Sequence, residues 1–135
     1  MAKLIRKILN WIPALLWATF IFYLSSKPGL KVATGFWDFA TRKPAHILVY
    51  FILYLLVYYG LVRTITTTTR NLLATAFLLT IFYGGTDEIH QSLVPLREGK
   101  ISDIIWDAIG ALVAFVILWK YFPNLPERLK RWLKS

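Results

Sequence analysis

The chain has no cysteine and few charged residues, and both scarcities narrow what it can be. Without cysteine among its 135 residues, disulfides, thiolate metal sites and a cysteine nucleophile are excluded. Only 17% of the residues are charged and 57% are hydrophobic, and the long apolar runs are typical of membrane proteins. The net charge of +9 therefore indicates membrane orientation and contact with membrane lipids, and we expect no nucleic acid as a partner.

Four apolar runs, each close to the roughly 20 residues that cross a bilayer, predict an all-α, polytopic bundle of four transmembrane helices with short loops. The expected spans are 8–24, 45–61, 72–91 and 103–121. The first run follows basic residues, as a signal peptide does, but it is long for one and no cleavage site follows, so we expect a retained span. Pro44 is expected in the first turn of the second helix. Close helix packing is expected at Gly60, Gly84, Gly85 and Gly110.

The basic residues predict an orientation. An even number of spans puts both termini and the connection at 64–70 on one side of the membrane. The 16 Lys and Arg residues then divide ten to six in favour of that side, which predicts that both termini are cytoplasmic. In the tail, 123–135, leucines and Trp132 alternate with basic residues. This pattern predicts a short amphipathic helix on the anionic leaflet, or else a solvated tail, after a four-helix domain at 1–122.

Polar residues gather where four helix ends meet on the predicted outer side. Five of the seven acidic residues lie between positions 87 and 107, and both histidines lie at these ends. Helical spacing predicts three shared faces, formed by Lys43, His46 and Tyr50, by Asp87, His90 and Gln91, and by Asp103, Asp107 and Gly110. Charged groups at this depth usually face a bundle interior or a wet pocket.

We therefore take one cluster as the candidate ligand site: Lys43, His46, Tyr50, Asp87, Glu88, His90, Gln91, Arg97, Asp103 and Asp107. Asp87 and Glu88 end a helix, where the helix dipole disfavours anions, so we expect compensation from Arg97, Lys43 or a protonated histidine. Asp103 alone is equally well explained as a helix cap, and Lys27 and Arg42 are interpreted as membrane anchors.

Whether this cluster is catalytic stays open, with Glu88, His90 and Asp107 as the candidate acids and bases. Asp87-Glu88-x-His90 is not a recognised metal-ligand motif, so we expect no metal and no cofactor. The chain also lacks a nucleophile elbow, a phosphate-binding loop and a zinc-protease motif.

The same residues resemble the VanZ-like family of small bacterial membrane proteins. The matching segments are Ser25-Ser26-Lys27-Pro28, Lys43-Pro-Ala-His46-x-x-x-Tyr50, Thr86-Asp87-Glu88-Ile-His90-Gln91, Pro95-x-Arg97 and Ser102-Asp103-x-x-x-Asp107-x-x-Gly110. The resemblance implies a four-helix domain in the bacterial cytoplasmic membrane, and the founding member is associated with low-level resistance to teicoplanin. The family usually has asparagine where this chain has Asp107, and the extra carboxylate is expected to change how the cluster is paired.

Three functions follow from these features. We favour a non-enzymatic envelope protein that binds a lipid-linked precursor or a glycopeptide, with Lys43 and Arg97 meeting phosphate or carboxylate. The alternative is a small membrane enzyme that acts on a lipid or lipid-linked head group by acid/base or metal-assisted chemistry. A transporter is the least supported, because the middle of each span has few polar residues and the chain lacks paired halves, although a homo-oligomer would weaken that objection.

Overall fold

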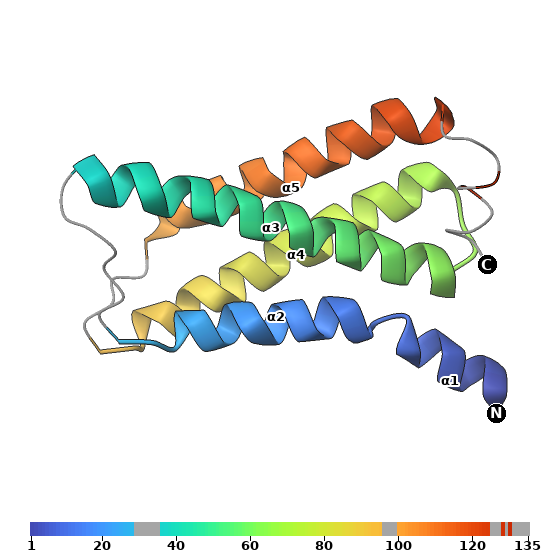
Figure 1. Ribbon diagram of the computed structural model, residues 1–135, viewed down its shortest axis with the longest axis horizontal. Coiled ribbons are helices and arrows are strands. Elements are labelled where there is room, and N and C mark those ends of the chain that lie inside the picture. Colours follow the sequence, from blue (N-terminus) through green and yellow to red (C-terminus); the bar gives the residue numbers. More distant parts are fainter. Residues whose placement is uncertain (29–35, 96–99, 125–127, 129, 131–135) are drawn as a thin grey trace.

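The computed structural model describes residues 1–28, 36–95 and 100–124 together with residues 128 and 130 (Figure 1). These ranges contain no strand, and their helices are α1 (Ala2–Leu9), α2 (Ile12–Ser25), α3 (Phe36–Thr64), α4 (Thr69–Ser92), α5 (Ile101–Tyr121) and the short 3-10 helix η1 (Phe122–Asn124). Four segments are long and apolar enough to cross a membrane: Leu4–Ser25, Arg42–Thr64, Thr69–Ser92 and Ile101–Asn124. The predicted all-α membrane bundle is confirmed, while the predicted tail helix lies mostly outside the described residues.

The first span is not the single uninterrupted helix that the sequence predicts. α1 ends at Leu9, Asn10 and Trp11 form the junction, and α2 begins at Ile12. Pro13 explains the break, because it has no N–H to donate to the Leu9 carbonyl and its ring crowds that carbonyl. Figure 1 shows α1 bending away from the bundle at this junction.

The second span begins earlier than the sequence predicts. α3 starts at Phe36, so Pro44 lies inside the helix and not in its first turn. An interior proline removes one backbone hydrogen bond and costs about 3 kcal/mol. Arg42 and Lys43, just before the proline, both form ion pairs with Asp103, and these contacts fix this part of α3 to α5.

Close contacts at three glycines bring the helices together, as predicted. An added Cβ would lie 3.0 Å from the Trp11 ring at Gly60, 3.2 Å from Asp107 Oδ2 at Gly84 and 2.2 Å from the Ile47 carbonyl oxygen at Gly110. The same prediction was wrong for Gly85, where no described atom lies within 4 Å of an added Cβ. The tightest of these contacts is between α3 and α5, which also share the most extensive helix interface.

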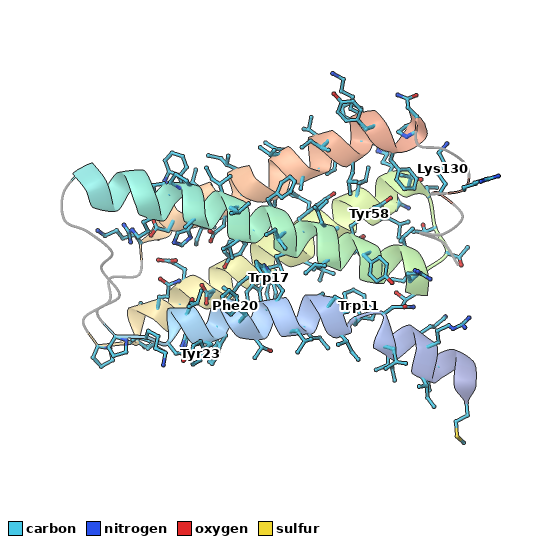
Figure 2. The ribbon with its side chains drawn as sticks, viewed as in Figure 1. Trp11, Trp17, Phe20, Tyr23, Tyr58 and Lys130 are labelled. Atoms are coloured by element: carbon cyan, nitrogen blue, oxygen red, sulfur yellow. The ribbon has the colours of Figure 1, made fainter. Side chains whose placement is uncertain are left out.

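Polar side chains inside the bundle bond to the backbone of neighbouring helices. Trp17 Nε1 donates to the Val49 carbonyl at 3.0 Å, and Tyr83 donates from its hydroxyl to the Ala18 carbonyl at 2.6 Å. Figure 2 shows Trp17 on the side of α2 that faces the rest of the bundle. Large apolar side chains instead cover the outside, with Phe82 73% and Leu78 68% exposed. A bundle of four long apolar helices with an apolar outer surface is suited to lipid, so the protein is a multi-pass membrane protein.

The topology separates the two ends of the bundle. The N-terminus and the connection between α3 and α4 lie at one end in Figure 1. At the other end, α2 and α4 finish while α3 and α5 begin. We call the latter the polar end, because the candidate site residues of all four helices gather there.

Candidate functional site

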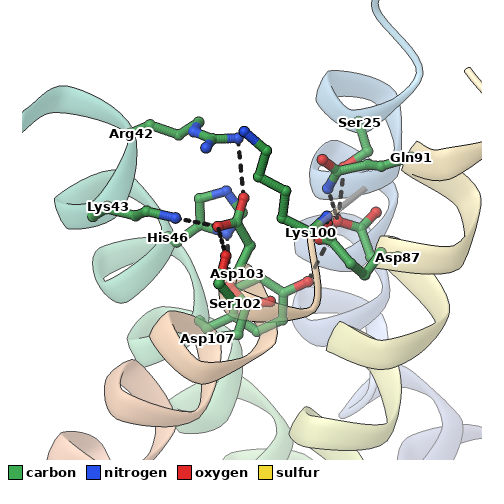
Figure 3. Close-up of polar contacts among 12 residues, drawn as sticks. Ser25, Arg42, Lys43, His46, Asp87, Gln91, Lys100, Ser102, Asp103 and Asp107 are labelled. Carbon is green, nitrogen blue, oxygen red and sulfur yellow. Dashed lines mark hydrogen bonds and ion pairs between the residues drawn. The ribbon is translucent and has the colours of Figure 1, made fainter. Parts of the chain in front are cut away.

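The polar end is organised by two helices that run in parallel, α3 and α5 (Figure 3). Three contacts join them in the same order along both helices: Lys43 with Asp103, His46 with Asp107, and Ile47 with Gly110. The two faces that spacing predicts on these helices therefore face each other. The remaining site residues come from α2 and α4, which meet beside this pair.

Asp103 is a buried carboxylate between two cations. Its side chain accepts a hydrogen bond from Lys43 Nζ, and the Arg42 guanidinium lies 3.0 Å from its Oδ2. Asp103 is 0% exposed and Lys43 is 7% exposed, so this ion pair lies out of solvent. Such a pair is held tightly, because removing one partner leaves an uncompensated buried charge.

Two interpretations of this group need correction. Asp103 is not a helix cap, since the N-cap of α5 is Lys100 and Asp103 directs its carboxylate to the cations of α3. Arg42 is likewise not a simple membrane anchor, because its guanidinium pairs with Asp103. Both interpretations relied on position alone, because Asp103 lies near a helix start, where caps are common, and Arg42 lies near the end of a span, where basic anchors are common.

His46 and Asp107 form the second pair between α3 and α5. His46 Nδ1 lies 2.7 Å from Asp107 Oδ1, and Asp107 is only 1% exposed. The Tyr50 ring is parallel to the imidazole at a centroid distance of 6.5 Å. When Asp107 is ionised it can only accept, so Nδ1 carries the proton and Nε2 is left able to take one. Asp107 thus orients the His46 imidazole.

Asp87 receives its donors from three helices. Its Oδ2 accepts from Ser25 Oγ at 2.8 Å, from Gln91 Nε2 at 2.7 Å and from the Tyr50 hydroxyl at 3.5 Å. Its Oδ1 is buried and has no hydrogen-bond donor within the described part of the chain. Asp87 thus ties α2, α3 and α4 together through one oxygen, while its other oxygen receives no donor from the described residues.

Glu88, the next residue, shows the same asymmetry. Its Oε1 accepts a hydrogen bond from the Lys100 backbone N–H, which links the end of α4 to the start of α5. Its Oε2 is buried, and no described residue donates to it. Of the cations expected to compensate these carboxylates, Lys43 pairs with Asp103 instead, and Arg97 lies outside the described residues.

His90 is separate from the other imidazole. Its Nε2 lies 2.9 Å from Ser26 Oγ, and its ring stacks on Phe22 at a centroid distance of 4.3 Å. Phe22 belongs to α2 and Ser26 caps its end, so His90 contacts the end of α2. The sequence pointed to Ser25 and Ser26, directly after the first apolar run, but did not place them among the site residues.

Nine of the ten predicted site residues are described, and eight of them cluster around the α3–α5 pair and Asp87, with His90 beside α2. The described residues include no group of three His, Asp or Glu side chains arranged to hold a metal ion. The described residues offer an oriented imidazole, a buried ammonium and two acceptor oxygens to which none of them donates. These groups can bind a polar molecule that has both donors and acceptors.

Comparisons with known proteins place the chain in a family. No curated protein and no solved structure matches the chain. The model of the VanZ/LLP1 family matches residues 6–123, which covers all four membrane-spanning segments except their outermost residues. The matched region includes every described residue of the polar cluster, and the chain belongs to the VanZ/LLP1 family.

Proposed function

We propose that the polar end binds the head group of a lipid-linked or glycopeptide-type envelope molecule. The observation that carries this proposal is the pair of buried oxygens, Asp87 Oδ1 and Glu88 Oε2, to which no described residue donates. A buried acceptor without a donor costs about 1–3 kcal/mol, and more when it is charged. A ligand that brings hydroxyl, amide or ammonium donors would recover that cost.

Lys43 supplies the opposite chemistry. Its ammonium has three donor hydrogens, and Asp103 accepts from one of them while the Trp106 ring lies 5.8 Å away. The ammonium is thus fixed in place and still able to donate to a phosphate or carboxylate. Sugars and peptides on phosphate-linked lipids present donors and anionic groups together, which matches acceptors and a cation at one site.

The location proposed for this site is the outer face of the bacterial cytoplasmic membrane. Ten of the 16 basic residues belong to the opposite side, which favours cytoplasmic termini. A head-group site on the outer face would meet envelope precursors and glycopeptides directly. A change in glycopeptide susceptibility, including susceptibility to teicoplanin, would then follow from competition for such molecules.

The test is retention of a ligand by the purified protein. Wild type, Glu88→Gln and Ser92→Ala are incubated with a bacterial lipid extract, and native mass spectra then record the bound species. We expect wild type and Ser92→Ala to retain a defined lipid-linked species and Glu88→Gln to bind it at least about tenfold more weakly, as for loss of a charged hydrogen bond. Ser92 is exposed at the same helix end and bonds only to its own helix, so it is the matched control.

Equal melting temperatures of the three proteins establish that a loss of ligand is not a loss of fold. Teicoplanin susceptibility of cells that express each variant tests the physiological part. Unchanged ligand retention and unchanged susceptibility in Glu88→Gln would leave the carboxylates as structural groups, and the proposal would be wrong.

One observation favours a second function, catalysis on the head group. Asp107 orients the His46 imidazole with Nδ1 at 2.7 Å, which leaves Nε2 to accept a proton as a general base would. Asp107→Asn keeps a hydrogen-bonding group of the same size but removes the charge that fixes the tautomer. For an enzyme we expect turnover to fall by about a hundredfold or more with little change in binding. A lipid pool that stays unaltered when the wild-type protein is overproduced would exclude this function.

A further inference from the structure

A second surface lies at the end of the bundle opposite the polar cluster, on α1. Rotation by about 100° per residue places Arg6 and Lys7 on one half of this helix. The other half is apolar and exposed, at 64% for Leu4, 51% for Ile5, 58% for Ile8 and 53% for Leu9. We call these four residues the apolar face of α1. α1 bends away from the bundle (Figure 1), and the described residues leave these four side chains more than half exposed.

The depth of the junction between α1 and α2 is fixed by α3. The Trp11 ring packs directly on Gly60, where an added Cβ would lie 3.0 Å from its carbons. Gly60 precedes the end of α3, at Thr64, by four residues, or about 6 Å of helix. Interfacial helices place their apolar faces about 5–10 Å into the boundary between head groups and acyl chains. The hinge thus leaves α1 at the depth at which such a helix lies.

The charge of this end indicates which lipids it meets. The described residues here include the basic side chains Arg6, Lys7, Arg63, Arg70 and Lys120, and no acidic residue. Each Lys or Arg near an anionic leaflet adds about 1 kcal/mol of attraction, or about a fivefold change in binding. This end of the bundle therefore combines the apolar face of α1 with a net positive charge among its described residues.

We propose that α1 is an interfacial helix that binds an anionic lipid surface, with its apolar face in the acyl boundary and Arg6 and Lys7 among the phosphates. Trp11, at the hinge, is the membrane anchor of the junction, because tryptophan favours this interface. α1 then extends the contact of the bundle with one leaflet. This proposal does not depend on the function proposed for the polar end.

The absence of cysteine allows a direct test, because each introduced cysteine is the only one in the chain. Nitroxide labels are placed singly at Leu4→Cys, Lys7→Cys and Ile8→Cys, and the full-length protein is reconstituted into bilayers. We expect labels at positions 4 and 8 to be accessible to oxygen at similar depths, and the label at position 7 to be accessible to an aqueous nickel complex. A straight continuation of α2 would instead separate positions 4 and 8 by about 6 Å in depth.

The lipid preference is tested with bilayers of phosphatidylcholine, with and without phosphatidylglycerol. With the anionic lipid we expect a larger embedded population of α1, reduced by up to about 25-fold in Arg6→Gln/Lys7→Gln. Three outcomes would overturn the proposal: a depth difference that fits a straight span, an embedded population that does not respond to phosphatidylglycerol, and short label-to-label distances between molecules. The last would assign the apolar face to a second copy of the chain.

Discussion

The contact between Gly110 and Ile47 predicts that the α3–α5 interface tolerates no side chain at position 110. In Gly110→Ala, the new Cβ would lie 2.2 Å from the Ile47 carbonyl oxygen, whereas an ordinary contact begins at 3.4 Å. The obstructing atom is backbone, so no side chain can rotate away, and the two helices must separate by about 1 Å. Overpacking of this kind costs about 3 kcal/mol, from which alanine's better helix propensity recovers about 1. The expected loss of stability is about 2 kcal/mol.

Gly85→Ala is the matched control for this change. It makes the same substitution inside a membrane-spanning helix, but no described atom lies within 4 Å of the added Cβ. We expect this variant to be neutral or more stable by up to about 1 kcal/mol. Unfolding of both variants in mixed micelles with increasing SDS, followed by circular dichroism, gives the two free energies. The reasoning is refuted if Gly110→Ala is as stable as Gly85→Ala.

The same separation has a consequence for the site. His46 is next to Ile47 in sequence, Asp107 lies one helical turn before Gly110, and the two side chains are joined at 2.7 Å. Moving the helices apart by about 1 Å would stretch this contact beyond the range of a hydrogen bond. We therefore expect Gly110→Ala to impair ligand retention as well as stability, although Gly110 has no polar side chain. Gly85→Ala should retain ligand like wild type.

Two further predictions concern buried polar groups. Tyr54→Phe should lower the free energy of unfolding by about 1 kcal/mol, because the Tyr54 hydroxyl donates to the Leu73 carbonyl at 3.2 Å. Tyr58→Phe should be neutral or stabilising, because no described residue bonds to the buried Tyr58 hydroxyl. The same SDS titration measures both, and equal losses would contradict the assignment. Asp103→Asn should cost about 3 kcal/mol or more, because it leaves the buried Lys43 ammonium without its counter-charge. Restoration of stability in the double variant Asp103→Asn/Lys43→Met would confirm that cause, and a further loss would refute it.

The number of spans and the gathering of polar residues were predictable from the sequence, because both depend on the lengths of the apolar runs and of the connections between them. An apolar run long enough to cross a bilayer has few other uses, and short connections between spans bring alternate helix ends together on one side. Proline was the weaker guide. Pro44 was expected in the first turn of its helix, but it lies inside α3, which begins at Phe36. The two residues before it pair with Asp103 of α5, a contact that local sequence does not reveal.

The partners within the cluster were not predictable, because they depend on how α3 and α5 rotate and slide against each other. The missing side chain at Gly110 sets both, since it brings the two backbones into contact at Ile47. From that contact, one turn back along α5 leads to Asp107, and His46 on α3 is then its neighbour. A further turn back leads to Asp103 opposite Lys43. Gly110 therefore sets the register of α5 against α3, while the residues at positions 103 and 107 decide which charges this register brings together.

Because the helix register is set at position 110, the effect of the side chain at position 107 can be considered separately. Because Gly110 holds α5 in place, an asparagine at position 107 would still lie opposite His46 and could still bond to it. What changes is the bonding: an ionised carboxylate can only accept, so His46 Nδ1 must donate to it, whereas an amide can donate or accept. Position 110 therefore sets how the two helices meet, while position 107 decides which nitrogen of His46 carries the proton.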